Sequence, residues 1–166
     1  MGNSNNMGIA GILLCYFPGI EQSWVDKAPT FPEVLAQFMT WFEQELLSLT
    51  NQSPTSKSFL FITCGDWDLG KMMKTQCNAS QLPVPPIFQA WANLKTIFMT
   101  HTNQKPKGMT DMLSKFNLPL VGREHRGIDD ARNIAEVAKA LVRQDVVLNF
   151  TTSMPKGYQY FRNALI

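Results

Sequence analysis

Two short stretches of the chain place acidic side chains beside residues that interrupt regular structure. The first, Asp66-Trp67-Asp68, directly follows an apolar run, a cysteine and a glycine. The second begins at His125 and reaches Asp130 five residues later, with Gly127 permitting a close turn between them. Carboxylates bind divalent cations, and a neutral imidazole accepts a proton. Together, the two stretches could therefore hold a metal ion next to a general base.

Each stretch also has a purely structural explanation. An aspartate at the start of a helix caps its first N–H groups, so Asp66 or Asp68 could cap the helix that follows. The helix dipole favours acidic residues in a first helical turn, which would account for Asp129 and Asp130. A loop histidine such as His125 is more often solvated than catalytic. Position alone leaves both interpretations open.

The elements around these residues would bring them to useful places. Residues 59–63, Phe-Leu-Phe-Ile-Thr, predict a buried strand. Ligands of α/β sheets bind beyond the carboxyl ends of strands, so Asp68 would lie at that edge. Residues 128–142 predict a helix with its apolar side chains on one face, and this helix would begin at Asp129 and Asp130.

The rest of the chain alternates helix and strand signals. Thr30 and Glu33 have capping-box spacing, which predicts a helix from Phe31 to about Leu49. Prolines interrupt the chain before residues 87–98, which could form a helix, a short strand or both in sequence. Further helices are predicted over residues 69–77 and 109–116, and a last strand over 146–150. This alternation indicates an α/β domain.

Composition narrows the class of protein. The 166 residues suit one domain, and the apolar share of 45% excludes a disordered, collagen-like or coiled-coil chain. A net charge of +2 is too small to indicate nucleic-acid binding by itself. Three cysteines without metal-ligand spacing indicate neither a zinc site nor a disulfide framework.

The start of the chain bears on its location. The apolar run Ile9–Phe17 is too short to span a bilayer and has no basic residue before it, as a secretory signal would. We therefore expect a cytoplasmic or nuclear protein with no membrane partner. Anchoring of this run at a membrane surface is a weaker alternative, because it lacks the basic face of interfacial helices.

Several motifs, taken together, resemble the DEDDh 3'-5' exonucleases, and within them the enhanced-RNAi-type exoribonucleases. The resemblance covers about residues 17–150 and includes segments 19–26 and 30–35 near its beginning. Its most specific motifs are Gly65-Asp66-Trp67-Asp68-Leu69, Trp91-Ala92-Asn93-Leu94-Lys95 and the run from Gly122 to Ala135.

The resemblance implies a ribonuclease-H-like α/β fold and two-metal hydrolysis of phosphodiester bonds at RNA 3' ends. In the complete family site, four carboxylates hold two Mg²⁺ or Mn²⁺ ions, and a histidine activates water. By position, Asp68 and Asp130 match metal carboxylates, and His125 matches the general base. Protein partners are not indicated.

The resemblance also suggests contacts to single-stranded RNA. Trp67, Asn93 and Arg126 are the residues we assign to substrate binding. Core packing is the favoured alternative for Trp67, as it is for Trp91. We do not expect Asp66 to be a principal metal ligand, and the same holds for Asp129.

One family feature is missing from the 166 residues. The family opens with a strand that carries Asp-x-Glu, whereas the first acidic residue here is Glu21 and no Asp-x-Glu follows it. We therefore expect an N-terminally truncated exonuclease fold without its opening strands: a divergent segment 1–16, a partial domain 17–150 and a tail 151–166. Hydrolysis should be weak or absent, and a non-catalytic RNA-binding or regulatory form is the alternative.

Overall fold

The computed structural model describes residues 21–50 and 59–152. The chain divides into two compact units, the first ending at Trp41 and the second starting at Phe42. Segment 1–16, the apolar run 9–17 and all but two residues of the tail 151–166 lie outside the described residues. Within the described ranges, no helix combines the length and apolar character that crossing a membrane requires.

The first unit contains a short helix, α2 (Gln22–Lys27), and the beginning of α3 (Phe31–Thr50). The predicted capping box is confirmed, because the backbone N–H of Thr30 donates to Glu33 Oε2 at 2.6 Å and its hydroxyl donates at 2.7 Å. These bonds stabilise the ionised carboxylate, and the pKa of Glu33 is accordingly lowered, chiefly by the hydroxyl. The helix predicted from Phe31 to about Leu49 therefore agrees with the observed α3 to within one residue.

A small parallel sheet lies in the second unit. β1 (Ile62–Thr63) pairs with β2 (Ala92–Asn93), with Ile62 opposite Ala92 and Thr63 opposite Asn93. The strand predicted over 59–63 is therefore right in place but too long. Its partner offers only two residues before the next helix begins, and a ladder cannot extend past its partner.

The strand predicted over residues 146–150 is wrong, because no strand is formed there. The next two residues, Thr151 and Thr152, contact the backbone at β2 mainly through their side chains. Thr151 Oγ1 accepts the backbone N–H of Asn93 at 2.8 Å, and Thr152 Oγ1 accepts that of Trp91 at 3.1 Å. These hydroxyls satisfy backbone donors that a further strand would otherwise have paired.

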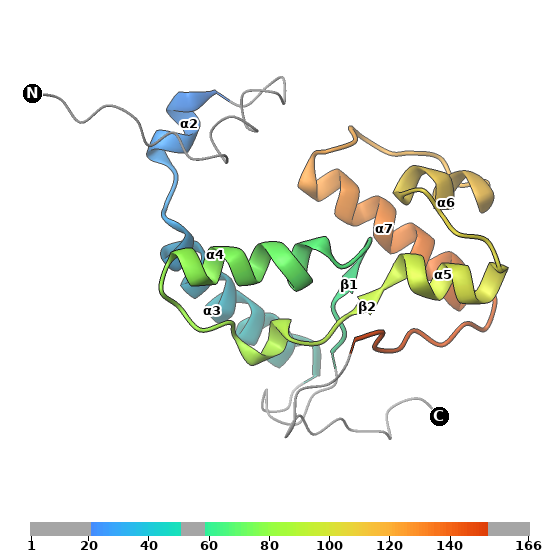
Figure 1. Ribbon diagram of the computed structural model, residues 1–166, viewed down its shortest axis with the longest axis horizontal. Coiled ribbons are helices and arrows are strands. Elements are labelled where there is room, and N and C mark those ends of the chain that lie inside the picture. Colours follow the sequence, from blue (N-terminus) through green and yellow to red (C-terminus); the bar gives the residue numbers. More distant parts are fainter. Residues whose placement is uncertain (1–20, 51–58, 153–166) are drawn as a thin grey trace, which may run out of the picture. The chain divides into compact units, whose positions relative to one another are not determined.

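Helices account for most of the regular structure described in the second unit (Figure 1). The predictions over 69–77, 109–116 and 128–142 are confirmed, although the first region begins with a turn of π-helix. Segment 87–98 contains a 3-10 turn, a strand and a helix in succession, so the mixed alternative was the right one. The helical elements are η2 (Trp67–Met73), α4 (Lys74–Ala79), η3 (Pro86–Phe88), α5 (Leu94–Thr102), α6 (Met109–Lys115) and α7 (Gly127–Val142).

The main apolar core lies among α5, α6 and α7. Phe98 from α5, Met112 and Leu113 from α6, and Val137 and Leu141 from α7 are almost completely buried there. The Phe98 ring meets the edge of the Phe116 ring at 5.1 Å between centroids. This packing holds α7 against α5 and α6, and together with the small parallel sheet it gives the predicted mixed α/β architecture.

Candidate functional site

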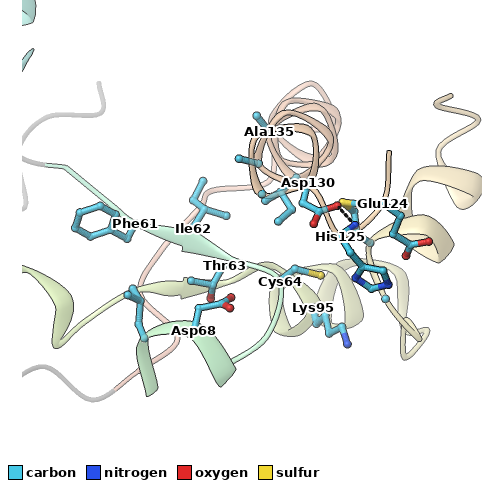
Figure 2. Close-up of a pocket in the computed structure, with 16 residues that line it drawn as sticks. Phe61, Ile62, Thr63, Cys64, Asp68, Lys95, Glu124, His125, Asp130 and Ala135 are labelled. Carbon is cyan, nitrogen blue, oxygen red and sulfur yellow. Dashed lines mark hydrogen bonds between the residues drawn. The ribbon is translucent and has the colours of Figure 1, made fainter. Parts of the chain in front are cut away.

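Side chains from β1, η2, α5, α6, α7 and the loop before α7 surround a hollow of about 680 Å³ (Figure 2). Asp68, His125 and Asp130 all line it. Figure 2 shows Asp68 and Asp130 on opposite sides of Cys64, with His125 beside Asp130. The two acidic stretches, which are distant in the sequence, therefore meet in space.

Asp66 and Asp68 have different surroundings although only Trp67 separates them. Asp66 accepts the indole N–H of Trp91 at 2.9 Å and the amide of Asn93 at 2.9 Å. Asp66 precedes η2 but its side chain makes no capping bond, so the capping explanation is wrong for this residue. Asp66 ties η2 to β2, and Asp68 is left facing the hollow.

The two tryptophans also differ. Trp91 is buried and packs closely against Gly70, where an added Cβ would stand 3.1 Å from the indole ring. Core packing is therefore confirmed for Trp91. It is wrong for Trp67, which is 59% exposed and has the Lys71 ammonium 4.4 Å from its ring centroid.

Asn93 does not line the hollow. Its side chain is buried, and its Oδ1 accepts the N–H of Lys95 at 3.0 Å, which caps the start of α5. Its amide nitrogen donates to Asp66 Oδ2. Both ends of the amide are thus used within the protein, which makes Asn93 a residue that positions η2 and α5.

Asp129 is only 5% exposed and holds the loop before α7. Its Oδ2 accepts the backbone N–H of Arg123 at 3.1 Å. Its carboxylate also forms ion pairs with Arg126 at 3.7 Å and Arg132 at 3.5 Å, both of them exposed. Gly122 has φ +80°, and a Cβ there would collide with this carboxylate, so the loop requires glycine.

Asn133 also holds the loop before α7. Its Oδ1 accepts the N–H of Val121 at 3.0 Å, and its Nδ2 donates at 2.8 Å to the carbonyls of both Val121 and Asp129. It is almost fully buried, so these bonds satisfy the whole side chain. The sequence showed Asn133 only as part of a motif, with no sign of this role.

Asp130 and His125 are joined through the backbone. Asp130 Oδ1 accepts the backbone N–H of His125 at 3.2 Å. His125 has φ +67°, a conformation that a non-glycine residue adopts only when its surroundings hold it. The carboxylate thus fixes the turn that presents the imidazole to the hollow. Arg126, one residue later, is not among the residues that line the hollow.

Cys64, which was not predicted as a site residue, lines the hollow together with Lys95. Burial raises the pKa of the Cys64 thiol. The Lys95 ammonium opposes that rise, whereas the carboxylates of Asp68 and Asp130 add to it. The charges of both candidate carboxylates therefore act on the pKa of this one thiol. Its place directly after the predicted strand was the signal that could have identified it.

The carboxylates determine what metal the site could hold. Asp68 and Asp130 line one hollow, but in the described ranges no three His, Cys, Asp or Glu side chains are grouped so as to hold a metal ion. Mg²⁺ often takes one or two carboxylates and completes its shell with water and substrate phosphates. The residues present fit one such ion, and they do not supply the four carboxylates of a two-ion site.

Comparisons with known proteins identify the family of this chain. A family model described as "Exonuclease" matches residues 15–138. Human ERI1 exoribonuclease 3 is 38% identical over 135 residues, which are 81% of this chain and 39% of the relative. Zebrafish ERI1 exoribonuclease 2 is 34% identical over 142 residues, which are 81% of this chain and 26% of the relative. The chain thus spans well under half the length of these relatives.

Solved structures show the same fold. The nuclease domain of 3'hExo, a DEDDh family member bound to rAMP, matches with a TM-score of 0.73 at 30% identity, covering 89% of this chain and 70% of that one. A structure described as 3'-end specific recognition of histone mRNA stem-loop by 3'-exonuclease matches with a TM-score of 0.71 at 29% identity, covering 87% of this chain and 61% of that one.

Proposed function

The chain belongs to the DEDDh exonuclease family, in its ERI1-type branch, and from this premise we propose that its hollow binds the 3' end of single-stranded RNA. The observation that carries the proposal is the meeting of Asp68, His125 and Asp130 around one space. Both neighbouring aspartates, Asp66 and Asp129, are held by donors of their own. Asp68, His125 and Asp130, which the family resemblance selects, are among the residues that line the hollow.

The DEDDh family depends on divalent metal, and Mg²⁺ or Mn²⁺ is the ion we propose here. Both ions prefer the oxygen ligands that Asp68 and Asp130 would provide. A bound ion would neutralise negative charge that builds on the scissile phosphate. Lys95, which lines the same hollow, would add positive charge near that phosphate.

His125 is the proposed general base. A neutral imidazole accepts a proton from water. The role of Asp130 is double in this proposal, because its carboxylate would bind metal and also holds the His125 backbone N–H. Proton acceptor and metal ligand would therefore keep a fixed relation to each other.

For the substrate, we propose that exposed Trp67 stacks on a base and that Arg126 contacts a phosphate. Stacking is favourable for any base, and it requires the open ring that Trp67 presents. Asn93 is better placed to position Asp66 and α5 than to touch RNA.

We further propose that residues 17–150 form a partial exonuclease domain, flanked by segments 1–16 and 151–166. We propose that the protein acts in the cytoplasm or the nucleus.

Hydrolysis by these 166 residues should be slow. They contain no Asp-x-Glu motif, and the described part groups no third metal-binding side chain with the two aspartates. The same observation favours a second candidate function, RNA binding without hydrolysis. Both functions use the same hollow and differ in whether the bound phosphodiester is cleaved.

The deciding experiment incubates the chain with 5'-labelled single-stranded RNA and either Mg²⁺ or Mn²⁺. Slow shortening from the 3' end should disappear in Asp68→Asn and in Asp130→Asn. It should persist in Asp145→Asn, which changes an exposed aspartate away from the candidate site. Binding without shortening would favour the second function, and absence of both would overturn the proposal.

A further inference from the structure

A second hollow, of about 360 Å³, shares a residue with the candidate site. Lys95 lines both hollows, and Lys105 and Lys107 line the second. The remaining lining residues of the second hollow are uncharged. Three lysines therefore gather with no lining carboxylate, in a protein whose total net charge is only +2.

The loop that carries Lys105 and Lys107 is held by hydrogen bonds to side chains of α5 and α6. Lys95 Nζ donates to the carbonyl of Lys107 at 2.9 Å, which joins α5 to the loop. The backbone N–H of Lys107 donates to Asp111 Oδ2 at 2.9 Å, and Lys115 pairs with the same oxygen at 3.3 Å. These bonds fix the Lys107 backbone relative to α5 and α6, so less backbone freedom is lost there when a ligand binds.

We call the second hollow, lined by Lys95, Lys105 and Lys107, the lysine hollow. We infer that it binds the sugar–phosphate backbone of nucleotides on the 5' side of the RNA terminus. The inference rests on the proposed function, in which the 3' terminus lies at Asp68 and Asp130. A strand that leaves this site past Lys95 enters the lysine hollow directly, because Lys95 lines both. Lysine ammoniums are point charges that attract phosphates without reading sequence.

A continuous strand explains the arrangement better than a free anion does. Lys95 lines both hollows, so one strand bound at the candidate site could contact both, whereas a free anion would occupy only the second. Successive phosphates of one strand would meet successive ammoniums. The chain should therefore bind longer RNA more tightly than very short RNA, and the excess affinity should depend on salt.

The test compares Lys105→Gln/Lys107→Gln with the matched control Lys74→Gln/Lys139→Gln, which removes equal charge from exposed positions on α4 and α7. Lys95 is left intact because it also lines the candidate site. Fluorescence anisotropy in EDTA measures the affinity for a 12-nucleotide RNA and for a dinucleotide over a range of salt concentrations.

The first pair should weaken 12-mer binding roughly tenfold at low salt and reduce its log–log salt slope by about 1.4, or about 0.7 for each ammonium that no longer meets a phosphate. Dinucleotide binding should stay unchanged, and the control pair should bind both RNAs nearly as the unsubstituted chain does. Equal 12-mer affinity in the two pairs would overturn the lysine hollow and leave the proposed function standing. No RNA binding by the unsubstituted chain would overturn both.

Photocrosslinking provides an independent readout. A 4-thiouridine placed at interior positions of the 12-mer should crosslink within residues 95–107, as identified by mass spectrometry. The same base at the 3' terminus should crosslink to residues around the candidate site instead. Interior crosslinks confined to other parts of the chain would overturn the inference even if the lysine substitutions weaken binding.

Discussion

The end of β1 and the start of α7 each carry two aspartates, and the pairs divide their tasks in the same way. At β1, Asp66 binds other side chains and Asp68 lines the hollow. At α7, Asp129 holds the preceding loop and Asp130 lines the hollow. In each pair, both oxygens of one carboxylate are used within the protein and its neighbour lines the hollow, although Asp130 also accepts the His125 backbone N–H.

The two holding carboxylates differ in how deeply they are placed. Asp129 is buried and is surrounded by a backbone N–H and two guanidinium groups. Asp66 is exposed at the surface and accepts two neutral donors. Removing a buried carboxylate leaves more donors without a partner. The loop before α7 should therefore depend more strongly on Asp129 than the segment after β1 depends on Asp66.

The largest expected effect follows from removing Asp129. Asp129→Ala should lower the free energy of unfolding by about 2–3 kcal/mol, because hydrogen bonds to a charged group are lost and the Arg123 N–H loses its partner. Asp130→Ala, the matched neighbour, should cost less than about 1 kcal/mol. Urea unfolding of both variants measures the difference. Equal losses would break the proposed division of tasks at α7.

Asp66→Ala should have the next largest effect, a loss of about 1–2 kcal/mol. It leaves the indole N–H of buried Trp91 and the amide of buried Asn93 without their acceptor. Asp68→Ala should change the free energy of unfolding by no more than about 0.5 kcal/mol, as surface substitutions usually do. A larger loss in Asp68→Ala than in Asp66→Ala, measured by the same urea titration, would reverse the assignment at β1.

Local patterns predicted much of this architecture from sequence. The apolar spacing that defines α7 and the capping box that starts α3 are contained within each helix, so their bounds were predicted closely. Strand limits depend on a partner elsewhere, which is why the strand predicted over 59–63 was too long and the strand over 146–150 did not form.

The candidate site shows the same limit. Motif resemblance selected Asp68, His125 and Asp130, and the structure places them around one hollow. Spacing alone could not separate Asp129 from Asp130, because adjacent residues share every local pattern. The hydrogen bond between Asp66 and Trp91 joins residues 25 positions apart, so neither segment alone could indicate it. Nor could residue type reveal that Trp67 is exposed while Trp91 is buried.

Cys64 offers a smaller effect that tests the two available carboxylates together. Both Asp68 and Asp130 raise the pKa of its thiol, so either Asp→Asn variant should lower that pKa and increase the thiolate fraction. Iodoacetamide labelling of Cys64 near pH 8, followed by mass spectrometry, should be roughly twofold faster in each variant. Lys95→Gln should slow the reaction. An effect from only one aspartate would mean that the two do not share one space around the thiol.

Substituting Asp111 should have the smallest effect on the free energy of unfolding. Asp111 accepts a backbone N–H as Asp129 does, but it lies in a more exposed position, so the two residues show how burial changes the effect. The Lys107 N–H is the main cause of its lowered pKa. Its contribution to stability should be fully present above the ordinary value of 3.8 and should be lost as pH falls through the lower folded-state pKa. The difference in urea midpoint between the unsubstituted chain and Asp111→Asn should therefore be small at pH 6 and vanish toward pH 2. A difference at pH 6 as large as that of Asp129→Ala would mean that burial does not set the strength of a holding carboxylate.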